Sequence, residues 1–244
     1  VGSEMCIRDR GNAAFHIGGG ADVMAVTEGA KYLGIYVSPG AMGIFLGALA
    51  SRAGRSLAAF AACLMLACAV AIMTCCKDGA GPGSPELPRG REQWLRLMSL
   101  LTVVVLRSYG GVIMSFPWKT GAWAWIAALC VVGGKCIGGF ASDRFGEVRS
   151  ATVTLSAAAA ALIFSAFPLP GALGLLLFNM SMPVTLYAAR DILREGRATA
   201  FGLLTLGLFL GMLPAFSGAS GSGQDYAMIC LISIMLIRVG VGKR

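Results

Sequence analysis

The chain has 244 residues, of which 57% are hydrophobic and 13% charged, and its net charge is +8. Soluble globular domains carry about 25% charged residues, so the composition excludes water as the main solvent, and it equally excludes a disordered chain, which would be poor in apolar residues. The positive residues stand in short gaps between apolar runs, as in loops at a membrane face. We therefore expect a lipid bilayer, and no nucleic acid, as the macromolecular environment of this protein.

Residues 1–10, VGSEMCIRDR, differ from everything that follows. They are polar and have no apolar core, so they do not form a signal peptide. They resemble the peptide that results when residual sequencing-adapter bases are translated. We interpret them as a non-native scar and expect the native chain to begin earlier.

The apolar stretches that follow predict membrane-spanning helices, because a span needs about 20 mostly apolar residues. The segment 11–21 is apolar but too short, and we interpret it as the end of another span. Eight further stretches are long enough: 32–50, 56–76, 95–117, 121–142, 150–168, 171–189, 199–217 and 226–242. We predict an all-α polytopic membrane protein with about eight full transmembrane helices and a partial one.

The longest gap is residues 77–92, KDGAGPGSPELPRGRE, in which Pro, Gly and charge predict a linker. It separates residues 11–76 from residues 93–244, which contain six of the predicted spans. Alternating spans then place thirteen Lys and Arg residues on the linker side and three (Arg52, Arg55 and Lys119) on the other. Positive charge marks the cytoplasmic side, so we expect a cytoplasmic linker and C-terminus. The thirteen are Lys31, Lys77, Arg89, Arg91, Arg96, Arg144, Arg149, Arg190, Arg194, Arg197, Arg238, Lys243 and Arg244.

Two G-x-x-x-G motifs indicate an internal repeat. One is Gly43–Gly47 in the span 32–50 and the other Gly207–Gly211 in the span 199–217, six spans apart. Such glycines let membrane helices approach closely. The spacing favours two related halves of six spans, a common design of transporters.

Residues 139–149, GFASDRFGEVR, resemble the short-loop signature of the major facilitator superfamily, G-x-x-x-D-R-x-G-x-[RK]-[RK]. Val148 and Arg149 stand where the signature has its basic pair. Residues 11–20, GNAAFHIGGG, also resemble the fourth helix of some bacterial drug-resistance-type members. The resemblance implies that residues 93–244 correspond to family helices 7 to 12, that residues 11–76 hold part of helix 4 with helices 5 and 6, and that helices 1 to 3 are missing.

The resemblance also implies a function and a location. The expected protein is a secondary active transporter of the cytoplasmic (inner) membrane that moves a small solute by alternating access, coupled to protons, and is monomeric when complete. In the family, the signature acid packs against the N-terminus of a helix from the opposite half. We therefore expect a cytoplasmic gate made of Asp143 and Arg144, with Arg190 as the charge partner of Asp143 in the second half.

Two cations fall inside predicted spans, Arg107 in 95–117 and Lys135 in 121–142, whereas every acid lies in a loop or at a span end. Ionisable residues at membrane depth are costly and usually face a cavity or a partner. One interpretation is a binding site for an anionic substrate, with Asn179 of the span 171–189 as a further polar contact. The alternatives are that Lys135 extends towards the cytoplasm and that Arg107 pairs with an acid of other helices.

His16 is the only histidine, and histidine is the side chain that titrates near neutral pH without perturbation. A proton-coupling role is one interpretation, and a hydrogen-bonded residue inside the bundle is the other. One histidine and scattered cysteines give no zinc site, so we expect no metal and no cofactor. An intramembrane enzyme and a non-transporting membrane sensor or assembly protein remain as alternatives to the transporter, and we expect no enzymatic activity.

Overall fold

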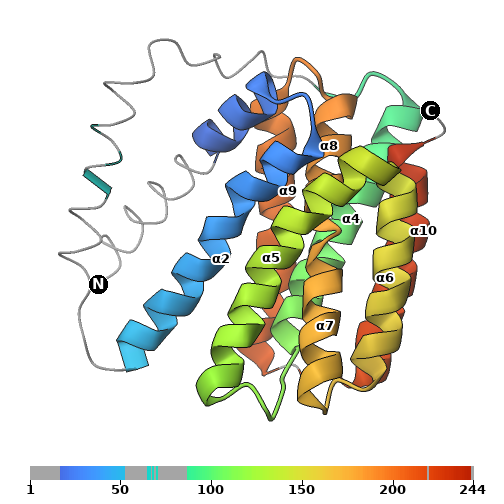
Figure 1. The fold of residues 1–244 in the computed structure, drawn as a ribbon. Coiled ribbons are helices and arrows are strands. Elements are labelled where there is room, and N and C mark those ends of the chain that lie inside the picture. The colour runs from blue at the N-terminus through green and yellow to red at the C-terminus, as the bar shows by residue number, and fades with distance from the viewer. Residues whose placement is uncertain are drawn as a thin grey trace.

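The computed structural model describes residues 17–52, 65, 66, 68, 70, 87–218 and 220–242, and these residues form helices and connecting turns without a β-strand. A first short helix, Ile17–Val26, precedes the labelled helices of Figure 1. The further elements are α2 (Ala30–Arg52), α4 (Arg91–Ile113), α5 (Gly121–Phe145), α6 (Glu147–Ile163), α7 (Pro168–Asn179), α8 (Met182–Ile192), α9 (Arg197–Met212), the 3-10 helix η1 (Leu213–Ser217) and α10 (Gly223–Val241). The prediction of an all-helical chain is confirmed for these residues.

Five helical segments in the described part of the chain are long and apolar enough to cross a membrane, fewer than the eight full spans predicted. The predicted span 56–76 lies almost wholly outside the described residues. The segments expected at 150–168 and 199–217 form helices of 17 and 16 residues, shorter than the about 20 residues of a typical span. The five are Ala30–Ala50, Arg91–Ile113, Gly121–Phe145, Pro168–Ile192 and Gly223–Val241.

The boundary of the predicted linker is also corrected. Helix α4 begins at Arg91, inside the range 77–92, and it ends at Ile113 rather than at residue 117. The first residues of α4, REQWLR, include three charged side chains, so the apolar pattern does not predict them as part of a span. They nevertheless form the beginning of the same helix. Residues 77–86 lie outside the described part.

The helices alternate in direction, which gathers the charged ends on one face of the bundle. Arg96 near the start of α4 donates to the carbonyls of Gly240 and Val241 at the end of α10, at 3.0 and 2.7 Å. The start of α2 meets the end of α5 on the same face. Ten of the described Lys and Arg residues lie at this end, which we call the basic end. The ten are Lys31, Arg89, Arg91, Arg96, Arg144, Arg149, Arg190, Arg194, Arg197 and Arg238.

Small residues on α5 allow it to pack tightly between α2 and α7, as Figure 1 shows. Gly134 and Gly138 face the backbone of α7 and of the turn after it, where an added Cβ would collide with the carbonyls of Leu176 and Met180. Gly139 faces α2, and an added Cβ there would lie 2.6 Å from Lys31 Cα. Backbones can approach this closely only where side chains are missing.

The two G-x-x-x-G motifs pack differently. A Cβ at Gly207 would lie 2.7 Å from Leu101 Cδ1, and one at Gly211 would collide with the Val105 carbonyl, so this pair forms the α9–α4 contact. Gly43 and Gly47 have no described atom within 4 Å of such a Cβ. The sequence similarity of the motifs therefore does not extend to a similar packing role among the described residues.

The opposite end of the bundle is closed by an aromatic cluster. Trp118 is only 9% exposed, its Nε1 donates to the Ser165 carbonyl at 2.8 Å, and its ring stacks on Phe116 at 5.1 Å. The chain places Trp118 in the α4–α5 loop, where tryptophans often anchor a protein in the membrane interface. In the structure Trp118 belongs to the core, while Trp125 is 46% exposed.

Candidate functional site

The basic end carries a long-range contact between α5 and α2. Asp143 Oδ1 accepts a hydrogen bond from the Ala30 backbone N–H at 2.7 Å, and Oδ2 accepts one from the Lys31 N–H at 3.1 Å. Both donors belong to the first turn of α2, whose N–H groups have no partner within the helix. The carboxylate also stands where the helix dipole favours negative charge. The expected contact between Asp143 and the backbone of this helix N-terminus is therefore present.

Three defined positions of the signature, Gly139, Asp143 and Gly146, have a structural reason here. Gly139 brings α5 against the backbone of α2, one turn before Asp143. Gly146 adopts a φ of +86°, which favours glycine, and its N–H closes the end of α5 by donating to the Ser142 carbonyl. The chain then turns directly into α6 at Glu147. The spacing G-x-x-x-D-R-x-G thus combines a close helix contact, an acid and a helix stop.

Arg190 does not act as the charge partner of Asp143 in the described structure. Its Nε donates to the Met24 carbonyl at 2.7 Å, at the end of the helix Ile17–Val26, and its guanidinium carbon lies 5.5 Å from the Tyr187 ring centre. A guanidinium cation near a helix C-terminus is favourable for the helix dipole. Arg190 therefore connects α8 to the helix that precedes α2, whereas Asp143 contacts the first turn of α2 itself.

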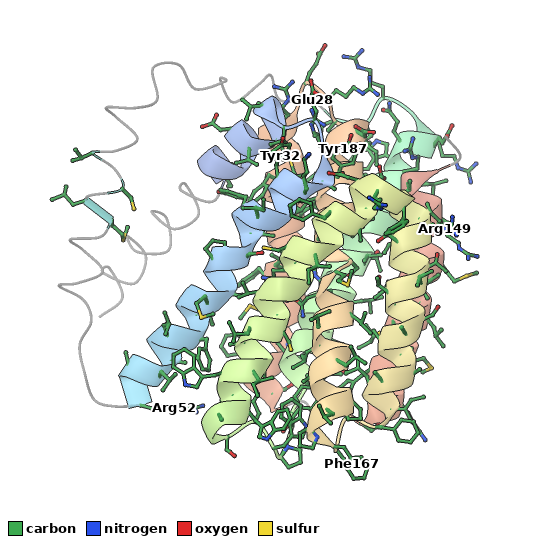
Figure 2. The ribbon with its side chains drawn as sticks, viewed as in Figure 1. Glu28, Tyr32, Arg52, Arg149, Phe167 and Tyr187 are labelled. Atoms are coloured by element: carbon green, nitrogen blue, oxygen red, sulfur yellow. The ribbon has the colours of Figure 1, made fainter. Side chains whose placement is uncertain are left out.

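Tyr187 belongs to the same group of contacts, although the sequence analysis did not single it out. Its hydroxyl donates to the Glu28 carbonyl at 3.2 Å, and Figure 2 shows Tyr187, Glu28 and Tyr32 together at the top of the bundle. The only feature of the sequence that could have pointed to Tyr187 is its position three residues before Arg190, which places both side chains on the same face of α8. Arg144 is exposed and lies near the Phe145 ring, at 5.8 Å, so the described contacts give it no part in holding α2.

An open cavity of about 840 Å³ lies at the basic end beside the Asp143 contact. Its walls come from the start of α2, the α5–α6 turn, α8 and the end of α10. The polar lining includes both signs of charge, and Ser142 Oγ in it is buried without a hydrogen-bond partner among the residues that the structure describes. The lining residues are Glu28, Gly29, Lys31, Tyr32, Ser142, Asp143, Gly146, Glu147, Val148, Arg149, Tyr187, Val241 and Gly242.

Arg107 lies inside the bundle. It is 7% exposed and occupies the buried stripe of α4 between Val103 and Gly110. Its Nη1 is sealed from solvent and has no hydrogen-bond partner among the described residues. The expectation that Arg107 avoids the outer surface is met, whereas its orientation towards another half of the protein stays a prediction.

Lys135 lies half-buried on α5, close enough to Arg107 for the two positive charges to act on one another. No described acid is buried inside the bundle: Asp22 is exposed in the middle of the helix Ile17–Val26, and the other described acids stand at helix ends or in turns. The described acids are Asp22, Glu28, Glu92, Asp143, Glu147, Asp191, Glu195 and Asp225. In the described part of the chain, the interior of the bundle therefore contains positive charge without negative charge.

Asn179 ends α7 at a break in the predicted span 171–189. The helix stops there and resumes as α8 at Met182, after a turn at Met180 and Ser181. Asn179 Nδ2 donates to the Leu175 carbonyl at 2.8 Å, which leaves the second amide hydrogen for another acceptor. Pro183 has no N–H to offer the Asn179 carbonyl. The break thus places backbone and side-chain polar groups at mid-depth.

A proline also interrupts α2, at Ser38-Pro39-Gly40, and Ser38 connects α2 to α5 through its side chain. Ser38 Oγ lies 2.6 Å from the Gly34 carbonyl and 3.2 Å from the Val132 carbonyl, and it accepts from Cys136 Sγ at 3.1 Å. These contacts hold the part of α2 before Pro39. Beyond it, no described atom lies within 4 Å of a Cβ built at Gly40.

His16, the candidate for proton coupling, lies outside the described residues. Within the described part, no group of three or more His, Cys, Asp and Glu residues could hold a metal ion. Models of known protein families and the curated proteins contain no match to this chain. The functional assignment therefore depends on the residues and their geometry.

Proposed function

We propose that this chain is part of a secondary transporter of the major-facilitator type, which moves a small solute across the cytoplasmic membrane by alternating access. The contact of Asp143 with the first turn of α2 is the observation that carries the proposal. It joins two segments that the linker separates, and it consists of two hydrogen bonds and one favourable dipole interaction, which a rigid-body movement can break and remake.

Three further features support the proposal. The charge asymmetry favours a cytoplasmic basic end by the positive-inside rule, and in that orientation the Asp143 contact would close the inner face. The α7–α8 break and the Ser38-Pro39-Gly40 segment supply interrupted helices, which transporters use near their binding sites. Arg107 supplies an unsatisfied polar group at mid-depth. Proton coupling belongs to the proposal through the family resemblance, with His16 as its candidate.

Single-cysteine labelling in a cysteine-free background tests alternating access without knowledge of the substrate. Ser142 is buried at the basic end, and Phe45 contacts Trp125 towards the other end of α2, with ring centres 4.9 Å apart. In a transporter, Asp143→Ala should increase maleimide labelling of Ser142→Cys and decrease that of Phe45→Cys, because opening one face closes the other. Arg144→Ala, next to Asp143 but outside its hydrogen bonds, is the control.

A sensor or assembly protein that lacks alternating access would respond differently. Asp143→Ala would then change labelling at Ser142→Cys alone, and labelling at Phe45→Cys would remain constant. That result would contradict the proposed function. Uptake of radiolabelled solutes into proteoliposomes provides the direct measurement once a substrate is in hand.

A further inference from the structure

Arg107 is in an unusual position for a guanidinium group. It is 7% exposed on the core-facing stripe of α4, and its buried Nη1 has no hydrogen-bond partner in the described part of the chain. A buried charge without a partner is strongly unfavourable, and arginine remains protonated under all ordinary conditions. The group therefore requires a negatively charged acceptor that reaches it from outside these helices.

Lys135 adds a second positive charge within electrostatic reach of the first. Two cations that repel each other are retained inside an apolar bundle, although the described acids all lie at its ends. A ligand with a single negative charge would leave one of these cations uncompensated. A ligand with two negative charges would compensate both.

The neighbouring backbone limits the size of such a ligand and supplies further polar groups. A Cβ at Gly110, one turn from Arg107, would lie 3.2 Å from Phe178 Cζ, and one at Gly134, next to Lys135, would lie 3.1 Å from Asn179 Cβ. The last residues of α7, just before the α7–α8 break, therefore pack against α4 next to Arg107 and against α5 next to Lys135. The free amide hydrogen of Asn179 offers a neutral donor at the same level.

We infer that the α7–α8 break forms a binding site for a small, doubly charged oxyanion, either a dicarboxylate or a phosphate. The fork of the Arg107 guanidinium holds one charged end, because its donors match the geometry of carboxylate and phosphate oxygens. Lys135 neutralises the second charge, and Asn179 donates to an oxygen of the ligand. This inference deepens the proposed function, on which it rests, by naming the class of substrate.

Thermal unfolding of the purified chain in detergent micelles tests the inference with three ligands of one shape. Succinate carries two negative charges, succinamate one and succinamide none, and each is added at constant ionic strength. We expect succinate to raise the unfolding temperature at the lowest concentration, succinamate to need at least tenfold more, and succinamide to have no effect. Inorganic phosphate forms a fourth arm: a response stronger than that to succinate assigns the site to phosphates, and a weaker one to dicarboxylates.

Variants then locate the site. Arg107→Gln should abolish the response to every anion, and Lys135→Met should remove the advantage of succinate over succinamate while retaining binding. Arg194→Gln, an exposed arginine of the basic end, should behave as the parent chain does. If Arg107→Gln does not fold, Arg107→Lys, which retains the charge but not the fork, should still weaken succinate binding at least tenfold.

The inference is overturned if no anion raises the unfolding temperature, if all three shape-matched ligands act equally, or if the Arg107 variants respond as the parent does. Uptake into proteoliposomes separates this failure from that of the proposed function. Anion binding without uptake of any bound anion would leave the inference standing and remove the transporter. Uptake of a neutral or cationic solute without an anion response would support the transporter and overturn the anion site.

Discussion

Asp143 Oδ1 and the Ala30 backbone N–H are 2.7 Å apart, although 113 positions separate the two residues in the chain. The hydrogen bond and its companion from the Lys31 N–H cap α2 with an acid from another helix. Most helices are capped by a residue of their own chain segment. A cap that comes from a distant helix links the end of α2 to the position of α5, so the two can separate only when the cap is lost.

Removing this cap should destabilise the contact between α2 and α5. Asp143→Ala eliminates both hydrogen bonds, and loss of a helix N-cap costs about 0.5–2 kcal/mol. We expect a lower thermal unfolding temperature in detergent, with a smaller decrease for Asp143→Asn, which retains one acceptor oxygen.

Glu92 provides the control for this experiment, because it is an exposed acid in the first turn of α4 without a hydrogen bond in the described structure. Glu92→Gln should leave the unfolding temperature nearly unchanged. Equal effects of Asp143→Ala and Glu92→Gln would show that the Asp143 contact contributes nothing specific.

The close approach of α5 to α2 should not tolerate a methyl group. A Cβ at Gly139 would lie 2.6 Å from Lys31 Cα and 2.7 Å from the Ala30 carbonyl oxygen, and backbone atoms cannot move aside as side chains can. We expect Gly139→Ala to cost about 1–3 kcal/mol, the usual range for overpacking. Gly133→Ala, in the same helix with open space around it, is the matched control and should be neutral or stabilising. A decrease in unfolding temperature of the same size in both variants would contradict this reasoning.

Two arginines of α4 should respond in opposite directions to the same substitution. Arg107→Met replaces an unpaired buried charge with an apolar side chain of similar length, so we expect a higher unfolding temperature, by ~2–4 °C for each kcal/mol gained. Arg96→Met removes the hydrogen bonds to the Gly240 and Val241 carbonyls and should lower it. Scanning fluorimetry in the absence of added anions measures both. A lower unfolding temperature for Arg107→Met would reveal a stabilising partner of Arg107 in the isolated chain.

The orientation of the bundle in the membrane can be checked in intact cells. Arg194 is exposed at the basic end, and Phe167 is 63% exposed at the other end, near the lower edge of Figure 2. In a cysteine-free background, a membrane-impermeant maleimide should label Phe167→Cys and spare Arg194→Cys until the cells are permeabilised. The reverse pattern would place the basic end outside and invert the proposed topology.

The sequence by itself determined that the described chain is helical and apolar enough for a membrane, because composition and the length of apolar runs depend on no long-range contact. The resemblance of residues 139–149 to the superfamily signature also implied the contact of Asp143 with the start of α2. The start of the α4 span was predicted at residue 95, whereas α4 begins at Arg91. Hydropathy detects only the apolar part of a helix, so the charged first turn of α4 was assigned to the linker.

Only the tertiary structure decided which small or polar residues meet. Gly139 and Gly43 look equally suited to close packing in the sequence, yet only Gly139 has a backbone against it. Arg190 was expected to pair with Asp143, but it is bound to the Met24 carbonyl instead, because a hydrogen bond depends on where α8 ends relative to the helix Ile17–Val26. Trp118 is buried rather than interfacial because the α4–α5 loop folds over Gly171, which has no side chain to keep the indole away. In each case the outcome depends on the relative placement of helices, which local sequence does not encode.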